Sequence, residues 1–251
     1  MLKTSLAGLR TFVLVPLFFL LTLVLATVII MYGLVRPTSR VPGRIVKRWS
    51  RWFLRIPPVR YEIEGLEHID PETRYIVASN HLSTFDIPLL LWVLPLEGRF
   101  LSKQELFKIP IVGRAMSTVG MIKIDRKSGS SSRVAIMEGV VLAAERGYSL
   151  IVFPEGTRSS DGELLPFKKG AFRIAIDTQL PVLPVIIEGN DRISKPGSKI
   201  FHPGRARVRI LPPVPTEGLT NRDNLNDLFR STEAAITEGY AELRRTSSHQ
   251  S

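Results

Sequence analysis

The feature that most constrains this chain is an uncharged apolar segment near its N-terminus. From Thr11 to Val35 the sequence runs for 25 residues without a charged side chain. At ~1.5 Å per residue, an α-helix of this length exceeds the ~30 Å hydrocarbon thickness of a bilayer. A secretory signal is the alternative, but its apolar region is ~7–15 residues long and ends in a small-x-small cleavage site, a pattern this run lacks. The segment therefore predicts a retained membrane anchor.

Positive charge is concentrated around this segment. The chain has 34 Lys+Arg and 23 Asp+Glu, which gives a formal net charge of +11. Ten of the basic residues and none of the acidic ones lie in residues 1–60, so residues 61–251 hold 24 basic and 23 acidic residues. A nucleic-acid-binding domain would carry its basic residues on the folded body. The distribution therefore predicts anionic membrane lipids, and no nucleic acid, as partners.

The charges also predict an orientation. Seven Lys/Arg follow the apolar segment between Arg36 and Arg55, whereas only Lys3 and Arg10 precede it. If the segment spans the membrane, this bias places the rest of the chain on the cytoplasmic side of the inner membrane. Pro16 allows a second geometry, a bent helical hairpin inside one leaflet.

Residues 41–56 (VPGRIVKRWSRWFLRI) follow as an amphipathic helix. Its apolar and aromatic residues recur at helical spacing, and its basic residues lie largely around the other face. Such a helix fits the headgroup layer of an anionic leaflet. A helix packed on the body with a solvated basic face is the alternative. Pro57-Pro58 ends it, so residues 1–58 are expected to form an anchor and a basic interfacial helix.

Residues 59–245 alternate strand and helix patterns and are expected to form one catalytic domain, followed by a polar tail at 246–251. The chain has no cysteine, hence no disulfide framework and no thiolate nucleophile. Short apolar strands interleaved with helices predict an α/β fold with a mixed, largely parallel sheet flanked by helices. The expected strands are 59–65, 74–79, 99–102, 120–125, 149–153, 181–189 and 205–211. The expected helices are 84–94, 109–119, 132–146 (Val134, Met137, Val141 and Ala144 facing inward), 169–179 and 222–243.

Two polar segments follow strands directly, where parallel sheets usually bind ligands. The first is Asn80-His81-Leu-Ser-Thr-Phe-Asp86. Five residues on one helix correspond to about 140° around its axis, so His81 must lie in the turn and Asp86 in the first helical turn if the two are to meet. A carboxylate can orient a histidine as a base near neutral pH. The alternative is structural, because Ser83 to Asp86 also forms a capping box.

The second polar segment is Phe153-Pro-Glu155-Gly156-Thr157-Arg158-Ser159. Gly156 permits close backbone approach, and Arg158 presents a planar fork suited to phosphate. A surface Glu-Arg pair in a turn is the alternative.

Together these segments resemble the lysophospholipid acyltransferase family over roughly residues 60–215. Four ordered blocks carry the resemblance: Asn80-His81-x4-Asp86, Gly120 to Arg126 (GMIKIDR), Phe153 to Ser159, and Leu180 to Val185 (LPVLPV), which includes Pro184. The resemblance implies a glycerolphosphate acyltransferase fold with an N-terminal membrane helix or helix pair. Lys123, in the second block, departs from the aromatic or apolar residue that relatives often carry there.

The resemblance also implies the chemistry. His81 is expected to act as the general base and Asp86 as its partner. The expected substrate-binding residues are Asn80, Gly120, Arg126, Glu155, Gly156, Thr157, Arg158 and Pro184, with Glu155 orienting Arg158 or the glycerol hydroxyl. The implied reaction moves an acyl group from acyl-CoA or an acyl carrier protein to lysophosphatidic acid, with no cofactor or metal. Alternatives are another lysolipid acceptor, such as a lyso-ornithine lipid or lysophosphatidylethanolamine, or a non-catalytic module that binds anionic lipid.

Overall fold

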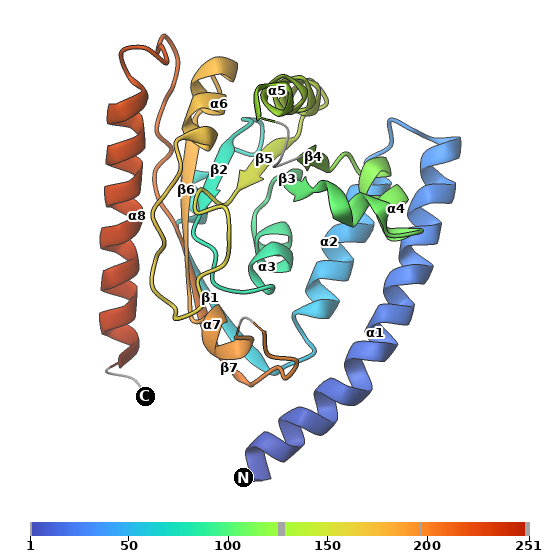
Figure 1. Cartoon of the computed structure of the whole chain (residues 1–251). Helices are drawn as coiled ribbons and strands as arrows, with labels where there is room; N and C mark the ends of the chain where they lie inside the picture. The colour runs from blue at the N-terminus through green and yellow to red at the C-terminus, as the bar shows by residue number, and fades with distance from the viewer. Residues whose placement is uncertain (1, 125–128, 196, 249–251) are drawn as a thin grey trace. The chain divides into compact units, whose positions relative to one another are not determined.

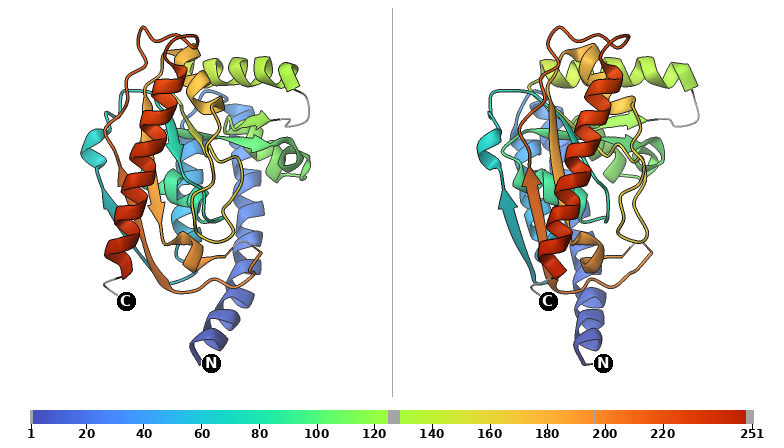
Figure 2. Two further views of the ribbon diagram at one scale, coloured as in Figure 1. Left: turned by 60° about the vertical axis from the view of Figure 1, so that its left-hand side comes forward. Right: turned by 90° about the vertical axis from the view of Figure 1, so that its left-hand side faces the viewer.

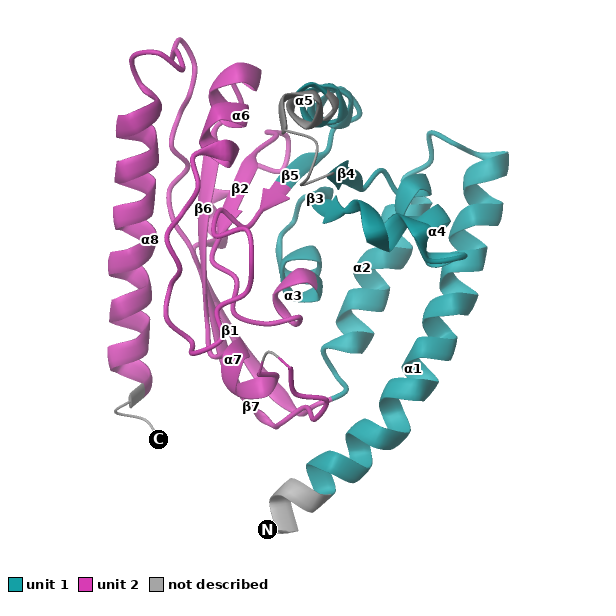
Figure 3. Cartoon of the chain, in the orientation of Figure 1, with its two compact units in different colours: residues 1–56, 88–150 teal, residues 57–87, 151–251 magenta. Residues whose placement is uncertain are grey.

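The computed structural model describes residues 2–124, 129–195 and 197–248. It divides the chain into two compact units, shown in Figure 3: unit 1 comprises residues 1–56 and 88–150, and unit 2 comprises residues 57–87 and 151–251. Within the described residues, seven strands form a sheet in the order β1-β7-β6-β2-β5-β3-β4 (Figure 1). Parallel and antiparallel pairs both occur, so the expected mixed α/β sheet flanked by helices is confirmed.

Unit 1 contains the N-terminal helices. They are α1 (Leu2–Val35) and α2 (Val41–Phe53). The unit also contains the helices α4 (Val112–Thr118) and α5 (Gly129–Glu145), the strands β3 (Gly98–Lys103) and β4 (Ile122–Ile124), and the 3₁₀ helix η2 (Gln104–Lys108). The strands β3 and β4 pair in parallel. Helix α3 (Asp86–Val93) and strand β5 (Ser149–Val152) each cross the boundary between the units.

Helix α1 is the one described helix that is long and apolar enough to cross a membrane, by length and composition, over Leu6–Val35. Its side chains are mostly exposed, and α2 packs along it through aromatic residues. Phe18 of α1 lies 5.6 Å from the Trp49 ring and 5.2 Å from the Phe53 ring, between ring centroids. The aromatic face of α2 therefore packs on α1, while Trp52 stays 37% exposed.

In unit 2, four strands pair in series, in the order β1-β7-β6-β2. Strand β1 (Val59–Glu64) runs parallel to β7 (Gly204–Ile210), β7 runs antiparallel to β6 (Val182–Glu188), and β6 runs parallel to β2 (Ile76–Ser79). All seven residues of β6 are buried, as expected for a strand covered on both faces. The 3₁₀ helix η1 (Leu66–His68) follows β1.

Helices α6 (Gly170–Thr178) and α8 (Leu225–Ser248) cover unit 2, and the short α7 (Asn190–Ile193) follows β6. Figures 1 and 2 show α8 alongside the strands of this unit. Gly239 allows close contact between α8 and β6, because a Cβ at this position would lie 2.4 Å from the Cδ1 of Ile186. The rings of Phe172 of α6 and Phe229 of α8 pack edge to face, with their centroids 5.4 Å apart.

Two helix predictions were wrong in detail. Helix α5 begins at Gly129, before Ser132, and its inner face is one residue out of phase with the prediction. Val140 and Ala143 are buried, whereas Val134 is 60% and Val141 44% exposed. The reason is that Gly139 faces β4, where a Cβ would lie 3.0 Å from Ile122.

Helix α8 ends at Ser248, five residues after the predicted end at Leu243. Buried polar groups of the sheet hold its last turn. Arg207 of β7 donates to the carbonyl of Leu243 and to the hydroxyl of Thr246, and Ser247 donates to Glu188 of β6 at 2.9 Å. Part of the predicted polar tail is therefore helical.

Candidate active site

His81 and Asp86 meet as the sequence predicts. His81 lies between β2 and α3, and Asp86 is the first residue of α3. The Nδ1 atom of His81 lies 2.8 Å from the Oδ2 atom of Asp86. An ionised carboxylate only accepts hydrogen bonds, so this contact assigns the proton to Nδ1 and leaves the lone pair on Nε2. Nε2 is thus the nitrogen that can accept a proton from a substrate.

Asp86 also caps its helix, so the contact with His81 and the structural alternative of a cap occur together. Its Oδ2 atom accepts hydrogen bonds from the backbone N–H groups of Leu82 at 2.6 Å and Ser83 at 2.7 Å. The side chain of Asp86 is fully buried, and that of His81 is 12% exposed. A buried carboxylate with several donors is held in one orientation.

Glu155 supports the main chain of His81. It follows β5, and its Oε1 atom accepts the backbone N–H of His81 at 2.8 Å, while Oε2 accepts the N–H of Leu165 at 3.2 Å. Burial, reinforced by the charge of Asp86, raises the pKa of Glu155 to about 7, although its two backbone donors act in the opposite direction. Among the described residues Glu155 has no ion pair with Arg158, because its oxygens are engaged by the main chain.

The third block contacts His81 in two further ways. The Phe153 ring is stacked on the His81 imidazole, with centroids 3.9 Å apart and planes 7° apart. The backbone N–H of Ser159 donates to the carbonyl of His81 at 2.9 Å. Blocks one and three are therefore brought together around one histidine. The sequence alone did not indicate this role for Phe153.

The remaining residues of the third block differ in exposure. Gly156 has φ +75°, a conformation that favours glycine, and a Cβ there would lie 2.9 Å from the Nζ of Lys168. Thr157 and Arg158 are exposed. Within the described ranges no acidic side chain pairs with Arg158, so its guanidinium is available to an anion.

Two buried asparagines connect the first block to β6 and α7. The side chain of Asn80 donates to the carbonyl of Ile187 and accepts its N–H, both at 2.8 Å. Asn190, which the sequence analysis missed, donates from Nδ2 to the Oδ1 of Asp86 at 2.7 Å. The signal was present, because Gly189-Asn190 directly follows a buried strand, the position at which the other two polar segments were recognised.

The other predicted site residues lie elsewhere in the chain. Pro184 is buried in β6, and its carbonyl accepts the N–H of Leu211 at 3.0 Å. Gly120, in unit 1, forms the turn before β4 with φ +84°. Lys123 of β4 is exposed. Arg126 lies outside the described residues.

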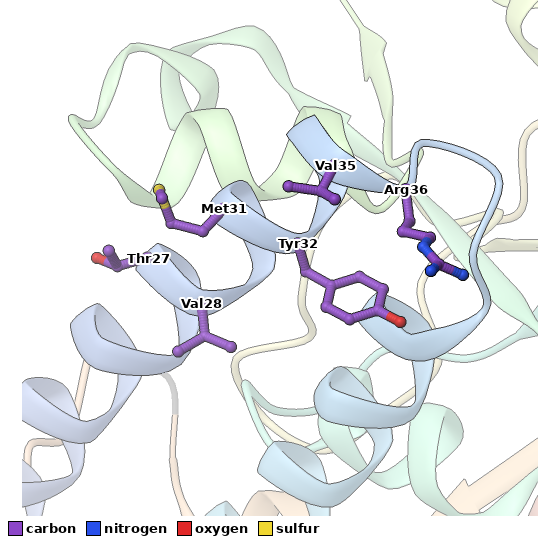
Figure 4. Close-up of a pocket in the computed structure, with 6 residues that line it drawn as sticks. All are labelled: Thr27, Val28, Met31, Tyr32, Val35 and Arg36. Carbon is purple, nitrogen blue, oxygen red and sulfur yellow. The ribbon is translucent and has the colours of Figure 1, made fainter.

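Unit 1 has a pocket of its own. It measures about 580 Å³ and is lined by Arg36, which directly follows α1, and by five residues of α1, namely Thr27, Val28, Met31, Tyr32 and Val35 (Figure 4). None of these is a predicted site residue. Nowhere in the described ranges do three His, Asp or Glu side chains gather as metal ligands.

Comparison with known proteins identifies the family. A family model described as Acyltransferase matches residues 60–188, a range that holds His81, Asp86 and Glu155. The chain belongs to the acyltransferase family. The expected resemblance is confirmed, and the contacts among His81, Asp86 and Glu155 occur within the part of the chain that this family shares.

Curated relatives and a solved structure agree with this assignment. The chain is 39% identical over 166 residues to 1-acyl-sn-glycerol-3-phosphate acyltransferase alpha of Mus musculus, covering 66% of this chain and 58% of the mouse protein. It is 35% identical over 193 residues to the Homo sapiens protein of that name, covering 74% and 68%. The match to the Limnanthes alba 1-acyl-sn-glycerol-3-phosphate acyltransferase covers 75% of this chain and 65% of that protein at 35% identity. The chain thus spans about three fifths to two thirds of these relatives.

The structural match covers nearly the whole chain. The crystal structure of the 1-acyl-sn-glycerophosphate (LPA) acyltransferase PlsC from Thermotoga maritima superposes with a TM-score of 0.72 at 28% identity, covering 97% of both chains. Because this match includes the N-terminal region, it extends the likeness beyond the range of the family model.

Proposed function

We propose that the chain is a 1-acyl-sn-glycerol-3-phosphate acyltransferase, which transfers a fatty acyl group from an acyl thioester to the sn-2 hydroxyl of lysophosphatidic acid. The relatives that carry this name support the acceptor. The single observation that carries the proposal is the 2.8 Å contact between the Nδ1 of His81 and the Oδ2 of Asp86 in the shared range. A module that only binds lipid has no use for an oriented base.

The reaction follows from this geometry. The Nε2 atom of His81 accepts the proton of the sn-2 hydroxyl while the oxygen attacks the thioester carbonyl, a contribution of roughly 10²–10⁴ in rate. The buried Asp86 carboxylate stabilises the imidazolium that forms. The tetrahedral intermediate then collapses, the carbon–sulfur bond breaks, and the leaving thiolate takes the proton from Nε2. The products are phosphatidic acid and the free thiol.

The stacked ring of Phe153 and the carboxyl of Glu155 position the base. Phe153 fixes the plane of the imidazole and places an aromatic face against the imidazolium, which is a favourable contact for a cation. Glu155 fixes the backbone of His81. Together they leave the side chain little freedom to turn away from the acceptor, which supplies part of the advantage of a preoriented base.

Arg158 is proposed to bind the acceptor phosphate. It is exposed, it follows a left-handed Gly156, and its planar fork matches two phosphate oxygens. Gly120, Thr157 and Arg126 remain proposed acceptor contacts. Pro184 is a proposed contributor to acyl-chain placement.

We also propose that α1 attaches the protein to the inner membrane with the catalytic residues on the cytoplasmic side. The support is the exposed apolar surface of α1, the basic residues after it and the α2 helix packed along it. Anionic lipids would contact the basic side chains of α2.

The acceptor can be tested by offering the purified protein several lysolipids with acyl-CoA and with acyl-loaded acyl carrier protein, and analysing the lipid products. We expect phosphatidic acid as the main product. Exclusive acylation of a lyso-ornithine lipid or lysophosphatidylethanolamine would contradict the proposed acceptor, and the absence of any acylated product would contradict the proposed reaction.

A further inference from the structure

The end of β6 and the segment that follows it, residues 187–194, contact the His81 loop at several points. Ile187 binds the side chain of Asn80 through both backbone groups. At the other end of the segment, the hydroxyl of Ser83 donates to the carbonyl of Ser194 at 2.9 Å. Between these two fixed points lies Asn190, whose amide reaches Asp86. The segment therefore holds the strand end, the loop and the carboxylate together.

Within this set, the contact of Asn190 acts on the catalytic pair most directly. The Oδ2 atom of Asp86 accepts hydrogen bonds from His81, Leu82 and Ser83, whereas the Oδ1 atom receives its hydrogen bond from Asn190. A carboxyl group rotates easily about its last bond unless both oxygens are held. The donor on Oδ1 therefore fixes which oxygen faces the imidazole.

The placement of Asn190 is itself constrained. Gly189 adopts φ +94°, and a Cβ at that position would lie 2.5 Å from the carbonyl oxygen of Arg205. This turn brings Asn190 to the first position of α7, where it is fully buried. Its Oδ1 atom has no hydrogen-bond partner among the described residues. A buried polar atom left in this state destabilises the fold, so stability alone does not account for an amide here.

We propose that Asn190 is a positioning residue of the acyltransferase site, which holds Asp86 so that its Oδ2 atom orients and stabilises the His81 imidazolium. This inference rests on the proposed function. It adds a third member to the hydrogen-bonded series Asn190, Asp86, His81. The segment after β6 then contributes to turnover by orienting the base, and not by binding the substrate.

The first test is Asn190→Leu in the full chain, assayed with lysophosphatidic acid and acyl-CoA. Leucine has a similar volume and no donor. Because the base is needed in the transition state, we expect kcat to fall roughly ten- to a hundredfold, the effect of losing a hydrogen bond to a charged group, with both KM values within about twofold. Asn224→Leu is the matched control. Asn224 accepts the N–H of Thr220 just before α8, so its loss lowers the melting temperature and leaves kcat unchanged.

The second variant, Asn190→Asp, keeps the shape and tests the donor through pH. Two carboxyl groups in contact share a proton, so the new side chain can donate to Asp86 only while it is protonated. We expect the ratio of variant to wild-type kcat to fall as pH rises, whereas the ratio for Asn224→Asp stays constant. The other titratable or charged groups nearby are His81, Glu155 and Tyr61 around Asp86, and Glu188, Asp191 and Arg192 beside Asn190. They are common to all the proteins compared.

A spectroscopic readout separates this inference from the proposed function. The Nδ1–H proton of His81, bound to a carboxylate, gives a downfield proton resonance that is identified by its loss in His81→Ala. We expect this resonance to shift or vanish in Asn190→Leu and to persist in Asn224→Leu. Folded Asn190→Leu with wild-type kcat and an unchanged resonance would overturn the inference, as would a pH-independent ratio for Asn190→Asp. Failure of the proposed function would show first as a wild-type protein that makes no phosphatidic acid.

Discussion

Glu155 is a buried acid whose carboxyl binds the backbone of the proposed base. Its pKa is raised from 4.5 to about 7, chiefly by burial. Between these two values the unfolded chain has lost the proton and the native protein keeps it. The native state therefore binds more protons, and the contribution of Glu155 to stability is full below about pH 4.5 and is lost as pH rises through about 7.

Glu155→Gln should remove this dependence. We expect the free energy of unfolding of the wild type to decrease by on the order of 3 kcal/mol more than that of the variant between about pH 4 and pH 8. Urea denaturation of both proteins at a series of pH values measures the difference. Other titrating groups, such as Asp191, are present in both proteins and cancel. Equal pH dependence in the two proteins would show that Glu155 keeps an ordinary pKa.

Among the residues of the site, the contact between His81 and Asp86 could be predicted from the sequence, because five residues are enough to connect the end of a strand with the start of a helix. The other contacts of the site join residues far apart in the sequence. Asn190 lies 104 residues after Asp86, and Glu155 lies 74 residues after His81. The expected contact between Glu155 and Arg158 is not made, because backbone N–H groups of His81 and Leu165 occupy both oxygens of the Glu155 carboxylate.

At the scale of elements, β6 is the strand on which the site depends. Its Ile187 uses both backbone groups to hold Asn80, which fixes the end of β2 just before His81. We expect Asn80→Ala to lower the free energy of unfolding by about 2–4 kcal/mol, because the N–H and carbonyl of Ile187 become buried without partners. Thermal or urea unfolding measures this. Asn226→Ala, at an exposed asparagine, is the control, and an equal loss in both would contradict the proposed role of Asn80.

The periodicity of the sequence predicted these elements well where they are long and buried. It placed β6 and α6 within one or two residues, since apolar runs bounded by Pro and Gly leave few choices. It failed at the inner face of α5, where Gly139 and not a large side chain contacts β4. It also ended α8 early, because the polar side chains that hold its last turn belong to β6 and β7.

For the whole molecule, membrane attachment is the property that the N-terminal region predicts. We expect the full chain to float with anionic vesicles in a density gradient, and a chain lacking residues 1–58 to stay in the dense fractions, whether it is dispersed or aggregated. The exposed apolar surface of α1 is the reason. Vesicles that carry the shortened chain upward as efficiently as the full chain would contradict the assignment of the anchor.

The central proposal is that the oriented imidazole of His81 performs acyl transfer to lysophosphatidic acid. The most direct measurement is the rate of phosphatidic acid formation by wild type and His81→Ala, with melting temperature and vesicle binding recorded for both. We expect the variant to fold, to bind vesicles like the wild type and to lose roughly 10²–10⁴ in kcat. A folded His81→Ala protein that forms phosphatidic acid at the wild-type rate would contradict the role of His81 as the base.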